Sequence, residues 1–239
     1  CLILLLVCFS CSSTNKDTNV GSDEIKLDDP ENLYKIAKLT FDQQEYELAR
    51  KQFLEIKKLF PSSNEAIQSE IMIAFLSYIQ MDYDNAILNF KKIINKYPSH
   101  KDLDYVYYMI AISNYEQLQN ESLDGYYNNL ALEAFDQVIK RFPESKYAKD
   151  SRQKIILVNS NIAAKHMEIG RFYLNNKKYI AALNRFKIVI DEFSITKFTP
   201  EALHRMVEAY YEMGMYEDSY NTAALLGYNY PDSKWYKLS

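Results

Sequence analysis

An aromatic residue followed by proline recurs through most of this 239-residue chain, and this feature restricts its fold more than any other. The pairs are Phe60-Pro61, Tyr97-Pro98, Phe142-Pro143 and Tyr230-Pro231, and Phe193-Ser194 stands where one further copy is expected. The aromatic residues follow one another at spacings of 37, 45, 51 and 37. A recurring spacing of this size predicts a stack of similar structural units.

Three positions upstream of each aromatic residue repeat as well, and each keeps one residue type in four of its five copies. Seven residues upstream stand Phe53, Phe90, Phe135, Phe186 and Ala223; eleven upstream stand Ala49, Ala86, Ala131, Ala182 and Ser219; fourteen upstream stand Tyr46, Tyr83, Asn128, Tyr179 and Tyr216. Intervals of three, four and seven residues place these side chains on one face of a helix. The proline then ends the helix. We therefore interpret these residues as packing residues, not as sites.

Another amphipathic stretch precedes each of these helices. These stretches cover residues 31–43, 66–80, 103–118, 161–176 and 200–213. The sequence therefore predicts an all-α fold, a superhelical array of about five helix pairs. The spacing of 45 places an insertion in a loop at 119–129, and the spacing of 51 predicts that one helix of repeats three to four is extended.

The pattern resembles the tetratricopeptide repeat, and the resemblance covers residues 31–236. The small residue that this family carries on the first helix of each pair is matched by Ala37, Ala74 and Gly170, each twelve residues before a repeated alanine. The resemblance implies that stacked pairs make the core and that the first helices line a concave groove.

The three cysteines, Cys1, Cys8 and Cys11, all lie in the first eleven residues. The run CLILLLVCFS is too short for an ordinary transmembrane helix and is typical of the apolar part of a secretion signal. With small Ser10 before Cys11, it resembles a bacterial lipoprotein signal at 1–10, which implies a lipidated Cys11; the alternative is a signal that is cleaved without lipidation. Residues 11–30 are polar and rich in turn formers, as expected of a flexible tether.

Charge and motifs indicate a binding module, not an enzyme. A net charge of −4 argues against nucleic acid as the main partner. His100, His166 and His204 lack a second histidine at helical spacing, so we predict solvated or capping histidines, no metal site and no cofactor. No cysteine beyond residue 11 could act as a nucleophile, and no pair of carboxylates stands out as an acid and base.

The first helices of the first two repeats are predicted to form an aromatic wall with one cation. The residues in this register are Tyr34, Lys38 and Phe41, followed by Ile71, Phe75 and Tyr78. An extended peptide with a terminal aromatic residue and a carboxylate could lay its ring there, with Lys38 near the negative group. Alternatively, some of these aromatic side chains pack against the next repeat.

Several segments together resemble the BamD family, lipoprotein subunits of the machinery that inserts β-barrel proteins into the bacterial outer membrane. The resemblance rests on five repeats, on Tyr97, His100, Asp104, Tyr105 and Tyr108 in the segment 97–118, on the insertion after it, on Ala181, Ala182 and Arg185, and on FPESKYAKDS and YPDSKW. It implies a lipid anchor at the periplasmic face of the outer membrane.

In that family the N-terminal repeats are thought to meet the C-terminal signal of unfolded barrel proteins, and the C-terminal repeats hold a BamA-like barrel subunit. The resemblance therefore implies roles in partner binding for Arg185, Tyr105 and Tyr108. Arg185 could pair with a carboxylate of the partner or form a salt bridge within the chain. The alternative function is a periplasmic tetratricopeptide scaffold for cell-wall or division proteins.

Overall fold

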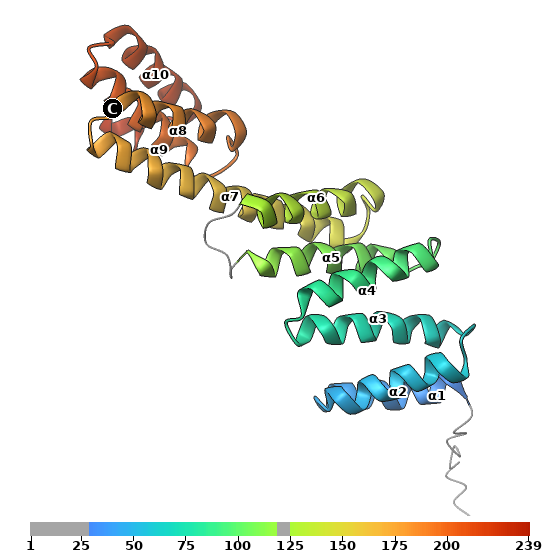
Figure 1. Ribbon diagram of the computed structural model, residues 1–239. Coiled ribbons are helices and arrows are strands. Elements are labelled where there is room, and N and C mark those ends of the chain that lie inside the picture. The colour runs from blue at the N-terminus through green and yellow to red at the C-terminus, as the bar shows by residue number, and fades with distance from the viewer. Residues whose placement is uncertain (1–28, 119–124) are drawn as a thin grey trace, which may run out of the picture.

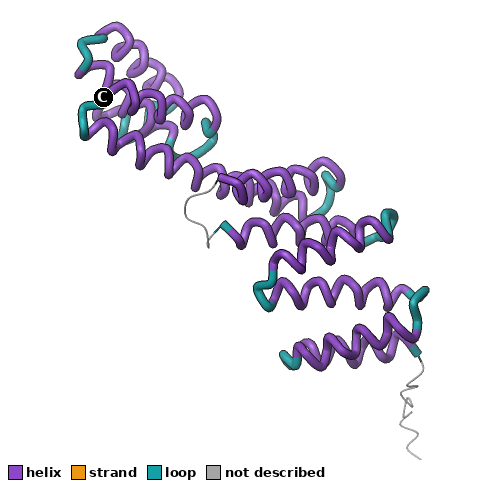
Figure 2. Tube along the Cα trace, in the orientation of Figure 1, coloured by secondary structure: helices purple, strands orange, loops and turns teal. Residues whose placement is uncertain are grey.

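The computed structural model describes residues 29–118 and 125–239, and all regular structure in that part of the chain is helical (Figures 1 and 2). The α-helices are α1 (Pro30–Asp42), α2 (Tyr46–Leu59), α3 (Asn64–Ile79), α4 (Tyr83–Lys96), α5 (Leu103–Gln117), α6 (Gly125–Arg141), α7 (Lys146–Asn175), α8 (Tyr179–Glu192), α9 (Thr199–Glu212) and α10 (Tyr216–Asn229), followed by the short 3-10 helix η1 (Tyr236–Leu238). Each helix packs on the next, and each first helix also contacts the next first helix. The predicted all-α array of five pairs is confirmed.

Within each pair a tight turn reverses the chain. A residue in the left-handed region ends the first helix in the four pairs whose turns are described: Gln44, Met81, Lys177 and Gly214. The amide after it bonds back to the helix, as when Asp82 N donates to Ser77 O at 2.9 Å and Lys178 N donates to Tyr173 O at 2.9 Å. These bonds satisfy carbonyls that the helix end leaves free.

The repeated residues form the core, as the spacing predicts. Phe53, Phe90, Phe135 and Phe186 are fully buried, and so are the four repeated alanines and Ala37 and Ala74 of the first helices. The small residue of the fourth pair, Gly170, is also buried, and a side chain there would collide with the ring of Phe186. A residue without a side chain is therefore required where α7 and α8 approach most closely.

Helix α7 has 30 residues and joins the third pair to the fourth, as Figure 1 shows. It packs on α6 and on α8, which accounts for the spacing of 51 and confirms an extended helix at this place. The predicted start at residue 161 is wrong, because the helix begins at Lys146, where Ser145 caps it by accepting from Tyr147 N at 3.2 Å. The predicted loop 119–129 is also too long, since α6 begins at Gly125.

A half-buried carboxylate joins three helices of the first two pairs. Glu70 of α3 lies 2.7 Å from Lys96 Nζ at the end of α4 and 3.4 Å from Lys57 Nζ of α2. Burial alone would raise the pKa of Glu70, but the hydrogen bond from Lys96 and the charges of both lysines outweigh it and hold that pKa below its usual range. The ion pairs therefore help to fix the stacking of the first repeats.

The predicted signal, the lipidated Cys11 and residues 11–28 of the tether lie outside the described residues. Among residues 29–118 and 125–239, no helix has the length and apolar character needed to cross a membrane.

Candidate functional site

The first helices build one continuous wall, because α1, α3, α5, α7 and α9 contact one another in that order. At the α1 and α3 end of this wall lie the aromatic residues predicted as a peptide-binding surface. Phe41 and Phe75 have ring centroids 5.8 Å apart, and Phe75 stacks on Tyr78 at 5.9 Å. Tyr34 packs on Phe53 at 5.6 Å. All four predicted aromatic side chains are half-buried, so each packs within the array and still presents part of its ring to solvent.

Two further residues of the predicted wall differ from each other. Lys38 is exposed and forms no ion pair with a described residue, so its ammonium group is available to a ligand. Ile71 is 3% exposed and belongs to the core between the second and third pairs, so its prediction as part of the open wall is wrong. Its side chain points between the helices, one turn before Phe75.

The aromatic surface continues into α5 and α7. Tyr105 and Tyr108 of α5 both pack on Tyr147 of α7, with ring centroids 5.5 and 4.9 Å apart. The hydroxyl of Tyr108 donates to Asp150 Oδ2 at 2.6 Å. Two of the three residues assigned above to partner binding, Tyr105 and Tyr108, therefore lie on the same wall as those assigned to substrate binding. We call the whole set, Tyr34, Phe41, Phe75, Tyr78, Tyr105, Tyr108 and Tyr147, the aromatic wall.

The tyrosine hydroxyls of this wall lie close enough to influence one another. Burial raises the pKa of Tyr105, and the neighbouring hydroxyls of Tyr147, Tyr78 and Tyr34 raise it further. Burial also raises the pKa of Tyr108, with the Asp150 carboxylate as its hydrogen-bond acceptor. These hydroxyls stay neutral, so the wall offers neutral donors and acceptors between apolar rings.

A polar hollow of about 430 Å³ opens beside these tyrosines, between the starts of α3, α5 and α7. Its lining includes Asp102 and Asp104, each of which is already bound: Gln68 donates to Asp102, and Ser145 Oγ donates to Asp104 at 2.6 Å. Lys101 and Lys146 line the same hollow and form no ion pair with a described residue. The hollow thus places two cations beside the tyrosine rings, and the ammonium group of Lys146 lies over the Tyr147 ring, 4.9 Å from its centroid.

Tyr147 is absent from the residues predicted from sequence, because the first helix of the fourth pair is predicted to begin only at residue 161. A signal was present in the helical spacing of Tyr147, Ser151, Ile155 and Val158, which continues without a break into the predicted helix. Ser151 and Val158 are fully buried in the structure, as that spacing would predict.

Arg185 lies on α8, well separated in the chain from the aromatic wall. It is half-buried and makes no ion pair with any residue of the described ranges, so the alternative of an intramolecular salt bridge finds no support there. Its charge acts on His166 of α7. Burial lowers the pKa of His166, and the charge of Arg185 lowers it further. A cation beside a neutral imidazole keeps its attraction for a carboxylate from outside.

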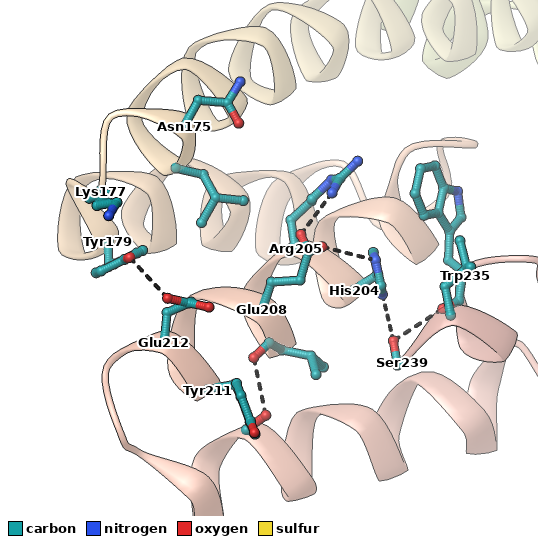
Figure 3. Close-up of a pocket in the computed structure, with 14 residues that line it drawn as sticks. Asn175, Lys177, Tyr179, His204, Arg205, Glu208, Tyr211, Glu212, Trp235 and Ser239 are labelled. Atoms are coloured by element: carbon teal, nitrogen blue, oxygen red, sulfur yellow. Dashed lines mark hydrogen bonds and ion pairs between the residues drawn. The ribbon is translucent and has the colours of Figure 1, made fainter.

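A second hollow, of about 820 Å³, lies at the α9 end of the row of first helices, beyond the aromatic wall (Figure 3). Tyr179 and Glu212 stand at one side, where the phenol donates to Glu212 Oε2 at 3.3 Å, and Trp235 stands at the other. Between them Arg205 Nη1 donates to Glu208 Oε2 at 2.7 Å, with its guanidinium over the Trp235 ring at 5.3 Å. The charged groups of this hollow are therefore largely paired with one another.

One of the three histidines, His204, differs from the prediction, whereas His100 Nδ1 accepts from Asp102 N at 3.3 Å at the start of α5, as a capping residue does. His204 is 5% exposed, with Nδ1 2.6 Å from Ser239 Oγ and Nε2 3.5 Å from Glu208 Oε1, so the prediction that it is solvated or capping is wrong. The C-terminal segment folds back over α9 and covers it, which the helical spacing of α9 could not show. Within residues 29–118 and 125–239, no group of three or more His, Cys, Asp or Glu side chains could hold a metal ion.

Comparison with known proteins places this chain in a family. The YfiO family model, an outer membrane lipoprotein family, matches residues 27–226. The outer membrane protein assembly factor BamD of Rickettsia prowazekii is 37% identical over 238 residues, which cover 100% of this chain and 92% of the relative. BamD of Caulobacter vibrioides is 45% identical over 121 residues, which cover 51% of this chain and 40% of the relative.

Solved tetratricopeptide structures are more distant. TTC0263, a protein of Thermus thermophilus, is 14% identical with a TM-score of 0.43, and the match covers 88% of this chain and 96% of that one. The family model and the Rickettsia relative both extend over nearly the whole helical array. The chain therefore belongs to the YfiO family of outer membrane lipoproteins, the family of the assembly factors called BamD.

Proposed function

We propose that this protein is a lipid-anchored subunit of the outer-membrane β-barrel assembly machinery. In this role it binds unfolded barrel proteins on its aromatic wall and a BamA-like barrel subunit near Arg185. The observation that carries the proposal is the aromatic wall, which runs across four first helices in a chain whose relatives are named outer membrane protein assembly factors. None of the relatives quoted above bears an enzyme's name, and the proposal assigns no catalytic step to this chain.

The chemistry of the wall suits an extended segment of a β-barrel strand. Such a strand alternates outward apolar or aromatic side chains with polar ones. Half-buried rings in a row can pack against the apolar set, while the neutral tyrosine hydroxyls can bond to backbone groups that have lost their sheet partners. Lys38 stands free at the α1 end of the wall, where it can attract a C-terminal carboxylate.

A peptide with a C-terminal phenylalanine tests the substrate proposal. We expect a fluorescently labelled strand peptide with a free carboxylate to bind the full chain, and amidation of that carboxylate to weaken binding by about two- to fivefold, as expected of one exposed charge pair. The variant Lys38→Ala should bind both peptides equally, because the group that distinguishes them is gone. Fluorescence anisotropy titrations measure all four combinations.

The matched control is Lys58→Ala, which removes another exposed lysine, at the end of α2. This variant should preserve the preference for the free carboxylate. A preference that survives in Lys38→Ala would refute the assignment of Lys38, and unchanged binding by a Tyr78→Ala variant would refute the aromatic wall as the binding surface.

The barrel subunit is proposed to bind around Arg185, with Tyr105 and Tyr108 as a second contact on the wall. A half-buried guanidinium without an internal partner suits a bidentate bond to a carboxylate of another protein. Reversing its charge should place two like charges against each other.

We expect Arg185→Glu to reduce recovery of the barrel subunit from detergent-solubilised membranes by at least about tenfold, since truncating a buried charge pair at an interface typically costs 2–5 kcal/mol. Lys187→Glu, an exposed lysine two residues along the same helix, should leave recovery unchanged. Equal recovery with both variants, or recovery of cell-wall enzymes in place of a barrel subunit, would contradict the proposal.

A further inference from the structure

A groove opens between the second helices α4 and α6, on the side of the array opposite the aromatic wall. Its volume is about 330 Å³, and α5, which lies between these two helices in Figure 1, forms its floor. The residues of α5 that line it are Tyr107, Ile110 and Asn114. At about 100° per residue, they stand on the other face of this helix from Tyr105 and Tyr108. The groove is therefore separate from the surface assigned to barrel substrates.

The preceding pair closes the corresponding gap with ion pairs. Glu70 stands ten residues after the motif aromatic and joins Lys57 of α2 to Lys96 of α4, so charged side chains bridge the gap over α3. In α5 the residue at that position is Tyr107, and the counterpart of Lys57 is Ile94. Neither side chain carries a charge, and no ion pair joins α4 to α6 in the part of the chain that the structure describes. The exchange of charged for apolar residues thus leaves this groove open.

The groove combines an apolar floor with amide groups that lack partners. Its apolar lining consists of Ile94, Tyr107, Ile110, Leu130 and Ala134. Asn114 is 7% exposed, and its Nδ2 donates to Ile110 O at 2.9 Å, while its carbonyl oxygen makes no hydrogen bond with a described residue. Asn95 and Gln137 line the groove from α4 and α6, and their amides make none with the described residues either. Amides both donate and accept, so they match the backbone groups of an extended peptide.

Opposite charges stand on the two walls of the groove. Lys91 lines it from α4 and Glu133 from α6, and both are exposed. Neither forms an ion pair with a residue in the described ranges. A ligand with charges of one sign is attracted by one wall and repelled by the other, whereas a segment with an acidic and a basic residue pairs with both. The charges therefore favour a segment that carries both signs.

The length of the groove suits a short piece of extended chain. Its lining residues run from Tyr107 to Asn114 along α5 and from Leu130 to Gln137 along α6. At a rise of about 1.5 Å per residue, each run is roughly 10 Å long, which an extended chain covers in about three residues. Side chains two positions apart in such a chain point the same way. One apolar residue therefore fits on the floor, with charged residues two positions before and after it at the rim.

We infer that this groove binds an extended segment of a partner protein, in which an apolar residue has an acidic residue two positions to one side and a basic residue two positions to the other. The apolar side chain lies over Ile110, and the two charges meet Lys91 and Glu133. The backbone of the segment bonds to the three amides that line the groove. The inference does not depend on the proposed function, because neither the aromatic wall nor Arg185 takes part.

The capped heptapeptide acetyl-TDTLTKT-amide has this pattern and serves as the probe. We expect saturable shifts of the side-chain amide resonances of Asn114 and Gln137 when it is titrated into the isotopically labelled full chain. A peptide with serine in place of leucine should bind at least about tenfold more weakly, because it buries no apolar side chain. Asn114→Ser should weaken binding by about two- to tenfold, because it removes the acceptor. The equivalent Ser77 bonds back to Ile73 O at 3.5 Å, so serine suits this position in the helix.

Lys91→Glu and Lys92→Glu form the matched pair. Both lysines are exposed neighbours on α4, but only Lys91 lines the groove. We expect Lys91→Glu to weaken binding of the probe by at least about threefold, because it replaces an attraction by a repulsion, and Lys92→Glu to bind as the unaltered chain does.

Four results of the titrations would overturn the inference: no saturable shifts at the groove, shifts confined to the aromatic wall, unchanged binding by Asn114→Ser, or equal binding by the two lysine variants. Equal binding of acetyl-leucine-amide would also overturn it, because the groove would then hold a small apolar compound. Sedimentation without peptide decides one more outcome, since self-association that Lys91→Glu abolishes would make a second copy the occupant in place of a partner segment.

Discussion

Replacing Phe186 by alanine is expected to lower the free energy of unfolding by about 3–5 kcal/mol, the range for removing a buried aromatic ring. The ring is fully buried between α7, α8 and α9, where it packs in one cluster with Met167, Val189 and Met206. It also fills the space that Gly170 leaves open. Because neighbours in a repeat stack depend on one another, the loss should spread to the last pairs. Urea unfolding of the full chain, followed by circular dichroism, measures it.

The same contact predicts that replacing Gly170 by alanine lowers the free energy of unfolding, although such a replacement in a helix usually raises it. Alanine in place of a helical glycine normally stabilises by up to about 1 kcal/mol, but a methyl group at Gly170 would collide with the Phe186 ring. Gly170→Ala should therefore destabilise by about 1–3 kcal/mol, the usual cost of overpacking. In the Phe186→Ala background the methyl group has room, so the cost should vanish. The exposed Phe172 serves as control, since Phe172→Ala should change stability by less than about 0.5 kcal/mol.

The stacking of this chain could be predicted from sequence because its packing residues recur in the same order. Each repeated Phe and Ala meets the same kind of neighbour. The helical spacing of these residues, together with the proline that ends most of the second helices, is therefore enough to predict five pairs. The start of α7 could not be predicted in this way. The register counted back from Phe193 reaches only the half of α7 that packs on α8, while the half before residue 161 packs on α6. No proline or glycine between Lys146 and residue 161 marks where one half passes into the other.

The site was predictable only as far as register determines it. Register placed Phe41, Phe75 and Tyr78 on the wall, but it also placed Ile71 there, because a residue at the edge of a helix face is buried or open according to its neighbours in space. The hydrogen bond from Tyr108 to Asp150 joins residues 42 apart in the sequence, and no local sequence pattern predicts it. Whether Arg185 lacks an internal partner likewise depends on side chains from other helices.

The other large effect concerns anchoring. Replacing Cys11 by alanine, in a chain expressed with its complete secretion signal, is expected to move the protein from the membrane fraction to the soluble fraction. Each buried methylene of an acyl chain contributes about 0.8 kcal/mol to membrane binding, and stable anchoring takes more than one chain. Without the sulfur and the terminal amine that follows signal cleavage, no acyl chain can be attached. Fractionation with a carbonate wash, together with labelling by radioactive palmitate, measures the result.

The thermal unfolding of the Cys11→Ala protein should match that of the unaltered chain, because the helical array begins at Pro30 and position 11 lies well before it. Cys8→Ala should remain lipidated and membrane-bound, since the residue before Cys8 is Val7, whereas Ser10 supplies the small residue that lipidation at Cys11 requires. Membrane binding of Cys11→Ala after the carbonate wash would contradict the lipid tether. A soluble and unlabelled unaltered chain would instead favour the signal that is cleaved without lipidation.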